Sequence, residues 1–134
     1  MNQFAGKLFI MTCAALCLFA QAAHGAGLGG IELRSALGQA LAAEIEILAL
    51  QPKEFEELQA RIASVEQYKA ANLIYAPVVR QVRVNALRRT GGKAVLQLTS
   101  SAPINEPSLD LLVEFTWPRG RLLQKYSILL DPQK

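Results

Sequence analysis

Histidine and cysteine, two residue types often used in catalysis, are scarce in this sequence and lie within its first 25 positions. The only histidine is His24, and the two cysteines are Cys13 and Cys17. A serine hydroxyl becomes a good nucleophile when a neighbouring base accepts its proton. Beyond His24 the strongest bases are lysines such as Lys93 and Lys125, whose places in a predicted turn and strand are explained by solubility. We therefore expect no enzymatic activity and no cofactor.

Metal binding is also poorly supported. Hard cations bind clustered carboxylates, and two pairs could each share a sheet face: Glu44 with Glu46, and Asp110 with Glu114. Neither pair has a histidine or cysteine nearby that would complete a transition-metal site. A solvated face explains both pairs, so no metal site is predicted.

Five basic residues around one predicted hairpin are the main candidates for binding: Arg80, Arg83, Arg88, Arg89 and Lys93. The simpler interpretation is a sheet edge kept soluble by charge. The alternative is an interaction patch that contacts an anionic wall polymer or an acidic partner. The net charge of the whole sequence is only +3. We expect no nucleic-acid binding, because nucleic-acid binders usually carry a dense basic face.

The first 25 residues have the three-part layout of a secretory signal peptide. Lys7 supplies the positive charge, residues 8–20 are apolar almost throughout, and small residues follow. The apolar run is too short to span a bilayer comfortably. Small residues at Ala23 and Gly25 suit a signal peptidase, which predicts cleavage between Gly25 and Ala26. Residues 1–25 are therefore assigned to the signal and residues 26–134 to a single exported domain.

Most of the exported segment is predicted to be β-structure. Apolar and polar residues alternate with the period of a strand that has one buried face, and turn-forming residues separate the runs. Residues 27–30 are predicted to be a flexible lead-in, and residues 100–107 a loop. Strands are expected at about residues 31–34, 41–48, 82–86, 94–99, 111–117 and 126–130, with a hairpin turn at 90–93.

The pattern changes to a helical period between the second and third of these strands. Pro52 can begin a helix, and Phe55, Leu58 and Ile62 follow at helical spacing. The charged residues Glu54, Glu57 and Arg61 are expected to point outward from this helix. Ser64, with Gln67 three residues later, predicts a capping box for a second short helix over about residues 65–71. The predicted fold is an antiparallel β-sandwich, immunoglobulin-like in one interpretation, with a two-helix insertion at about residues 52–71.

The long strand near the C-terminus is expected to contribute to the core. One face carries Leu111, Val113, Phe115 and Trp117, and the other is expected to be the wetter face. Buried tryptophan is the usual state at the end of such an apolar face. Trp117 is therefore interpreted as a core residue rather than as a platform for a ligand.

Three segments together resemble one known family: SALGQALAAEIEI (residues 35–47), PKEFEELQARIAS (residues 52–64) and TSSAPINEPSLDLLVEFTWPRGRLLQKYSILLDP (residues 99–132). They resemble the N-terminal periplasmic domain of FimV-type pilus assembly and polar hub proteins. The resemblance implies a Gram-negative periplasmic domain without enzymatic activity. It also implies a role in type IV pilus assembly, twitching motility or polar organisation, with envelope or pilus-assembly proteins as partners.

The sequence departs from the family pattern at three places. Ala40 stands where proline is expected, Ser108 where an apolar or aromatic residue usually follows Glu-Pro, and Lys125 where glutamate usually precedes the tyrosine. Longer family members continue into a peptidoglycan-binding LysM module, a membrane helix and a cytoplasmic repeat region. The 134 residues of this sequence contain no such module. The resemblance therefore does not imply peptidoglycan binding of the kind that the LysM module provides. The second functional hypothesis is a binding module for peptidoglycan or another anionic envelope polymer, using the hairpin that carries Arg88 and Arg89.

The export hypothesis predicts the N-terminus of the secreted protein. Protein isolated from the periplasm should begin at Ala26, or at Ala23 if the alternative cleavage site after Ala22 is used. Intact-mass measurement distinguishes these forms. Soluble protein that retains Met1 would contradict the prediction.

Overall fold

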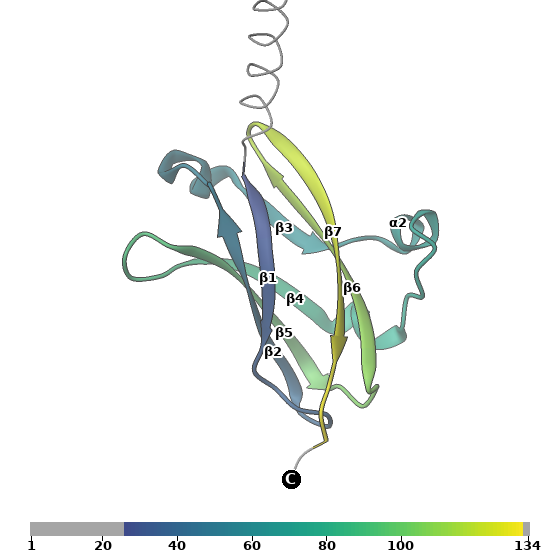
Figure 1. Cartoon of the computed structure of the whole chain (residues 1–134). Coiled ribbons are helices and arrows are strands. Elements are labelled where there is room, and N and C mark those ends of the chain that lie inside the picture. The colour runs from purple at the N-terminus through teal and green to yellow at the C-terminus, as the bar shows by residue number, and fades with distance from the viewer. Residues whose placement is uncertain (1–25, 133–134) are drawn as a thin grey trace, which may run out of the picture.

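Two antiparallel sheets pack face to face in the computed structural model, which describes residues 26–132 (Figure 1). One sheet has the strand order β1-β2-β5-β4, and the other has the order β3-β6-β7. The predicted antiparallel sandwich is therefore confirmed. The strands in the described residues are β1 (Gly27–Leu33), β2 (Ala40–Leu48), β3 (Gln59–Ile62), β4 (Val82–Arg88), β5 (Ala94–Pro103), β6 (Ser108–Trp117) and β7 (Gly120–Leu129).

The core lies between the sheets and is built from the inward positions of the alternating strands. The four-stranded sheet contributes Ile45, Leu96 and Leu98, and the three-stranded sheet contributes Val113 and Phe115. All five side chains have no exposed surface. Burying an aliphatic or aromatic side chain of this size contributes about 1.5–3 kcal/mol. In the absence of cysteine after residue 25, this packing is the main source of stability.

The first predicted helix is present only in part. A 3-10 helix, η1, covers Pro52–Glu57, and the chain becomes extended at Leu58. Gln59–Ile62 then forms β3, which pairs antiparallel with β6. The helical spacing of Phe55 and Ile62 misled the sequence analysis, because an alternating segment as short as β3 fits both periods. Pairing with β6 decides in favour of the strand.

The second helix, α2 (Val65–Ala70), begins and ends as predicted. The Ser64 hydroxyl accepts a hydrogen bond from the Gln67 backbone N–H at 3.2 Å, and the Gln67 side chain accepts one from the Ser64 N–H at 2.8 Å. Asn72 follows the helix with a φ of 59°, a conformation that asparagine tolerates well at a helix end. The capping box is confirmed.

Tyr68 of α2 completes the edge of β6 beyond the end of β3. Its hydroxyl donates to the Asp110 carbonyl at 3.0 Å and accepts from the Leu112 N–H at 2.8 Å. These backbone groups would otherwise lack a neighbouring strand. The Tyr68 side chain has no exposed surface, and its ring packs edge-to-face against Tyr75 at 4.9 Å between centroids. A side chain thus takes the place of a missing strand.

Three further elements differ from the sequence-based expectations. The glycine-rich segment expected to be a flexible lead-in belongs to β1 and pairs with β2. The segment expected to be a loop at residues 100–107 continues β5 as far as Pro103, where the Ser100 hydroxyl accepts a hydrogen bond from the Leu41 N–H at 2.8 Å. A second 3-10 helix, η2 (Pro77–Gln81), precedes β4. In the first two cases pairing with β2 overrides weak local preferences.

Strand β6 is buried on both faces, although its outward face was expected to be wet. Leu112 and Glu114 point away from the core, yet only 4% and 7% of their surfaces are exposed. Trp117 at the end of the strand packs against the core and stacks on Phe115 at 5.2 Å between ring centroids, but it is only partly buried. Among residues 26–132, no helix is long and apolar enough to cross a membrane.

The role assigned to Tyr68 predicts a specific stability loss. Tyr68→Phe keeps the ring but leaves the buried Leu112 N–H without a partner, which costs about 1–3 kcal/mol. Tyr75→Phe is the matched control, because the Tyr75 hydroxyl forms no hydrogen bond within residues 26–132. The midpoint of urea denaturation should be lower for Tyr68→Phe than for the wild-type domain, and it should be unchanged for Tyr75→Phe. Equal midpoints for the two variants would contradict the assignment.

Candidate interaction surface

The candidate basic residues lie on and around the hairpin that joins β4 to β5. Gly91 and Gly92 have φ values of 87° and 80°, which only glycine adopts without strain. Figure 1 shows the hairpin projecting from the body of the sandwich. The turn predicted at residues 90–93 is therefore present. Side chains on either side of it reach different surfaces, because successive residues of a strand point to opposite faces.

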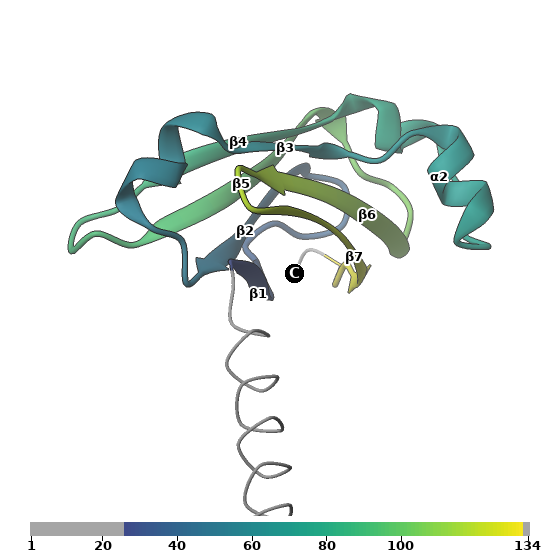
Figure 2. The same cartoon turned by 90° about the horizontal axis from the view of Figure 1, so that it is seen from above.

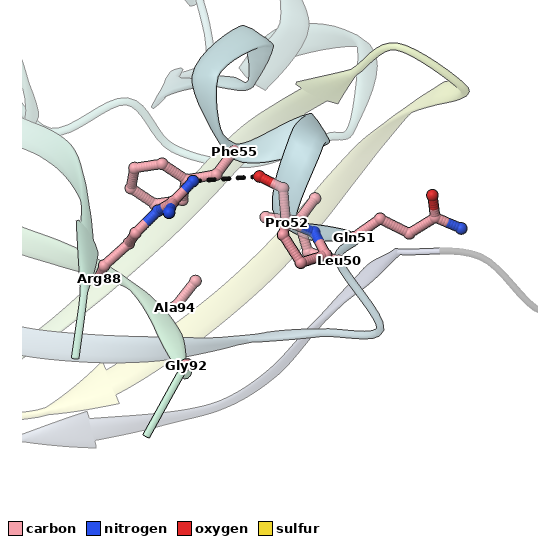
Figure 3. A pocket seen from close by; sticks show the side chains of 7 residues that line it. All are labelled: Leu50, Gln51, Pro52, Phe55, Arg88, Gly92 and Ala94. Atoms are coloured by element: carbon pink, nitrogen blue, oxygen red, sulfur yellow. Dashed lines mark hydrogen bonds between the residues drawn. The ribbon is translucent and has the colours of Figure 1, made fainter. Parts of the chain in front are cut away.

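Arg88 turns towards η1 and lines a small cavity of about 110 Å³ (Figure 3). Its guanidinium lies 4.5 Å from the centroid of the Phe55 ring and donates to the Pro52 carbonyl at 3.0 Å. The Glu56 carboxylate lies 3.4 Å away. Arg88 therefore holds the hairpin against η1 through a cation–π contact and a hydrogen bond.

Arg89 points to the outer face of the four-stranded sheet, where it forms an ion pair with Glu44 of β2. Arg34 approaches the same carboxylate to 3.1 Å from the other side. The Glu44 side chain is only 12% exposed. Glu44 thus lies between two arginines, one following β1 and the other following β4, which are the two edge strands of this sheet.

Lys93 shares a shallow hollow with this ion pair. The hollow has a volume of about 320 Å³, and Glu32 and Glu46 line it together with Glu44. Its lining is therefore mixed in charge, with three acidic and two basic residues. A surface of this kind suits a partner that carries both charges better than a uniformly anionic one.

The five predicted residues do not all share one surface. Arg89 and Lys93 lie together on the outer face of the four-stranded sheet. Arg83 is exposed on β4, and the alternation of the strand places it on that same face. Arg88 instead faces η1. Arg80 is exposed in η2. Whether any of them contacts a partner stays a prediction.

A second charged cluster lies on the outer face of the three-stranded sheet, and the sequence analysis missed it. Glu114 of β6 accepts a hydrogen bond from the Gln67 side chain at 2.8 Å. Arg61 of β3 and Arg121 of β7 approach it to 3.4 and 3.3 Å. The Gln67 hydrogen bond, followed by the charges of Arg61 and Arg121, lowers the pKa of Glu114. The two arginines flank one carboxylate because β3 and β7 pair with β6 on either side, and α2 adds Gln67.

Glu54 ties η1 to the turn between β6 and β7. Arg119 donates to both oxygens of its carboxylate, at 3.0 and 3.1 Å, and the Gln51 N–H donates at 3.0 Å. These hydrogen bonds, Arg119 first, lower the pKa of Glu54. The sequence analysis placed Glu54 on an outward helix face, and that was wrong. A 3-10 turn aims the carboxylate at a residue 65 positions away.

Comparison with known proteins identifies the family. Residues 26–133 match the model of the FimV N-terminal domain, described as an Ig-like domain. The chain belongs to this family. The resemblance drawn from residues 35–47, 52–64 and 99–132 is therefore confirmed, as is an immunoglobulin-like fold.

Two curated relatives carry the name Motility hub protein FimV, both from Pseudomonas aeruginosa, strains PAO1 and UCBPP-PA14. Each is 41% identical to this chain over 119 residues. The match covers 89% of this chain but 13% of each relative. No solved structure matches the chain. The relatives therefore share one domain with this chain, and most of their length lies outside the match.

The carboxylate pairs considered as metal ligands are used differently in this FimV N-terminal domain. Glu44 is bound by arginines, and Asp110 accepts a hydrogen bond from the Ser127 hydroxyl at 2.7 Å. Within residues 26–132, no group of three or more metal-ligating side chains is close enough to hold an ion. Positions 1–25, with the predicted signal peptide and the cleavage site at Gly25, lie outside the described residues.

The lowered pKa of Glu114 predicts acid sensitivity. Its ordinary pKa is 4.5, so the unfolded chain takes up the proton at a higher pH than the folded domain does. The stabilisation is therefore complete above about pH 5 and decreases as the pH falls through and below 4.5. Glu114→Gln should flatten this dependence in denaturation measured from pH 6 to 3. Glu57→Gln is the control, because Glu57 is exposed and has no ion pair in residues 26–132. An unchanged pH profile for Glu114→Gln would contradict the assignment.

Proposed function

We propose that this FimV N-terminal domain is a non-catalytic, periplasmic protein-interaction domain that supports type IV pilus assembly, twitching motility or polar organisation. Family membership carries the proposal. The name of the P. aeruginosa relatives, Motility hub protein FimV, associates the domain with motility and with a role as a hub. A hub works through contacts with other proteins, and envelope or pilus-assembly proteins are the partners proposed here.

The surfaces of the domain are consistent with recognition of proteins. Its outer faces carry charged side chains that are already held in place by neighbours, as Glu44 is by Arg34 and Arg89, and Glu114 by Arg61 and Arg121. Charged groups with fixed positions favour specificity, because a partner must match each of them. A rigid sandwich also loses little conformational entropy on binding.

Binding of an anionic envelope polymer such as peptidoglycan remains the second candidate. The exposed hairpin carries Arg88, Arg89 and Lys93, as that hypothesis requires. However, Arg88 and Arg89 each contact a carboxylate within the domain. Binding a polyanion would have to compete with these ion pairs. We therefore place this candidate below protein interaction.

Genetic complementation tests the proposed role. Deleting the gene should reduce twitching or disturb polar placement, and a plasmid encoding the full chain should restore both. The control plasmid lacks codons 2–25, so that its product stays in the cytoplasm and should not restore either. Normal motility and normal polar markers would contradict the proposal if the deletion strain carries no second gene that encodes a member of this family. Rescue by the cytoplasmic form would contradict the periplasmic location alone.

Co-sedimentation with purified sacculi tests the second candidate. The double variant Arg88→Gln, Arg89→Gln removes two charges, and Gln is chosen because a carboxylate at position 89 would face Glu44. Both arginine side chains are about half exposed, at 51% and 45%, and Glu44 keeps its ion pair with Arg34, so the fold should be retained. Arg80→Gln with Arg83→Gln is the control of equal charge. We expect weak binding that neither variant changes. Strong, salt-sensitive binding that only the hairpin variant loses would favour the polymer instead.

A further inference from the structure

The outer edge of the three-stranded sheet is the least protected edge of the sandwich. Strand β7 pairs with β6 through ten consecutive residue pairs without a register shift. On its other side it has no strand partner among residues 26–132. Figure 2 shows this edge lying beside β1 at the open side of the sandwich. An unpaired edge of this length and regularity is a template for pairing with another strand.

The other three edges are each protected in a recognisable way. β1 has a register shift between Leu28 and Ile31, and a shift of this kind disrupts further pairing. β3 has only four residues. β4 lies alongside β3, so that these two edges close the opposite side of the sandwich (Figure 2). β7 is therefore the one edge in the described residues that combines length with regular geometry.

The hydrogen-bond register shows which backbone groups of β7 are free. The Leu130 N–H donates to the Pro107 carbonyl at 2.8 Å, which continues the ladder by one pair. Since hydrogen-bonding residues alternate along an antiparallel strand, even-numbered residues of β7 face β6 with their N–H and C=O groups. The odd-numbered residues from 121 to 129 direct theirs away from the sheet. β1 contacts β7 by another route, because the Tyr126 hydroxyl donates to the Gly29 carbonyl at 2.6 Å.

Exposed apolar side chains lie on these same odd-numbered residues. Leu129 is 74% exposed and Leu123 is 43% exposed. Lys125 lies between them and forms no ion pair within residues 26–132. Contact with water does not stabilise two leucine side chains on the free edge, whereas a pairing strand would cover them.

We propose that β7 pairs antiparallel with β7 of a second copy of this chain, with the two-fold axis at Tyr126. In this register Leu123 of each copy lies opposite Leu129 of the other, and Lys125 lies opposite Ser127. Leu123, Lys125, Ser127 and Leu129 then exchange backbone hydrogen bonds with the second copy. The two three-stranded sheets become one continuous six-stranded sheet.

The side-chain pairs that form across the two strands favour this register over the two neighbouring registers. A shift of two residues in one direction would place Lys125 opposite itself, and a shift in the other would place Leu129 opposite Lys125. Like charges directly opposite each other are destabilising. In the proposed register Lys125 of the second copy lies next to Ser127, whose hydroxyl donates to the Asp110 carboxylate. Lysine and carboxylate thus approach each other across the dimer axis.

A charge-swap series tests the proposal on the mature chain purified from the periplasm, using sedimentation equilibrium. The double variant Leu123→Lys, Leu129→Lys places like charges opposite each other twice in the dimer and should raise the dimer dissociation constant by about ten-fold or more. The double variant Leu123→Lys, Leu129→Glu places opposite charges together and should restore dimerisation. Circular dichroism checks that both variants fold.

Three outcomes would overturn the proposal. The first is a wild-type chain that is monomeric up to its solubility limit. In that case β7 either pairs with a different protein or is kept unpaired by the charge of Lys125. The second is a dimer that is unaffected by Leu123→Lys with Leu129→Lys, which would place the interface elsewhere. The third is equal weakening in both double variants, which would exclude this register.

A cross-link gives an independent test of the same register. The chain has no cysteine after residue 25, so Leu123→Cys with Leu129→Cys introduces the only two thiols of the mature form. Within one molecule the two positions are six residues apart on an extended strand, about 20 Å, and cannot form a disulfide. Oxidation should therefore give a covalent dimer, whereas Leu123→Cys with Ser127→Cys should give much less. Equal yields from the two pairs would contradict the register.

Discussion

The burial of β6 on both faces is the constraint on which the rest of the domain depends. From Leu111 to Phe115 every side chain is buried, so each polar group of this segment needs a partner within the protein. The inward side meets this need by apolar packing. On the outward side, the Glu114 carboxylate needs positively charged neighbours. The β6 backbone groups beyond the end of β3 also need hydrogen-bond partners. Most of the insertion between β2 and β4 serves one of these two purposes.

The insertion can be understood from this constraint. β3 covers four residues of β6 and brings Arg61 to Glu114. α2 then supplies Gln67 to the same carboxylate and Tyr68 to the unpaired backbone. The short helix is therefore more than a connection, because its two side chains complete the strand that β3 leaves unfinished. η1 adds Glu54, which fixes the far end of β6 through Arg119.

The sequence was sufficient to predict the class of the fold and most of its strands. Strict alternation, as at Ile45 and Ile47, and turn signals such as Gly91-Gly92 are local properties that survive folding. It was insufficient where pairing decides the outcome. Gln59–Ile62 fits a helix and a strand equally well until β6 lies beside it. Leu112 and Glu114 look solvent-exposed from their alternation, and only tertiary covering buries them.

The candidate surface was predictable in composition but not in geometry. Five basic residues near one hairpin suggest a single patch, yet a strand sends Arg88 and Arg89 to opposite faces. Their partners, Glu56 and Glu44, are 32 and 45 residues away, and no local pattern reveals such distant pairings. The free edge of β7 differs in kind: Leu123 and Leu129 stay exposed among residues 26–132, so the reason for them is sought in a contact outside the domain.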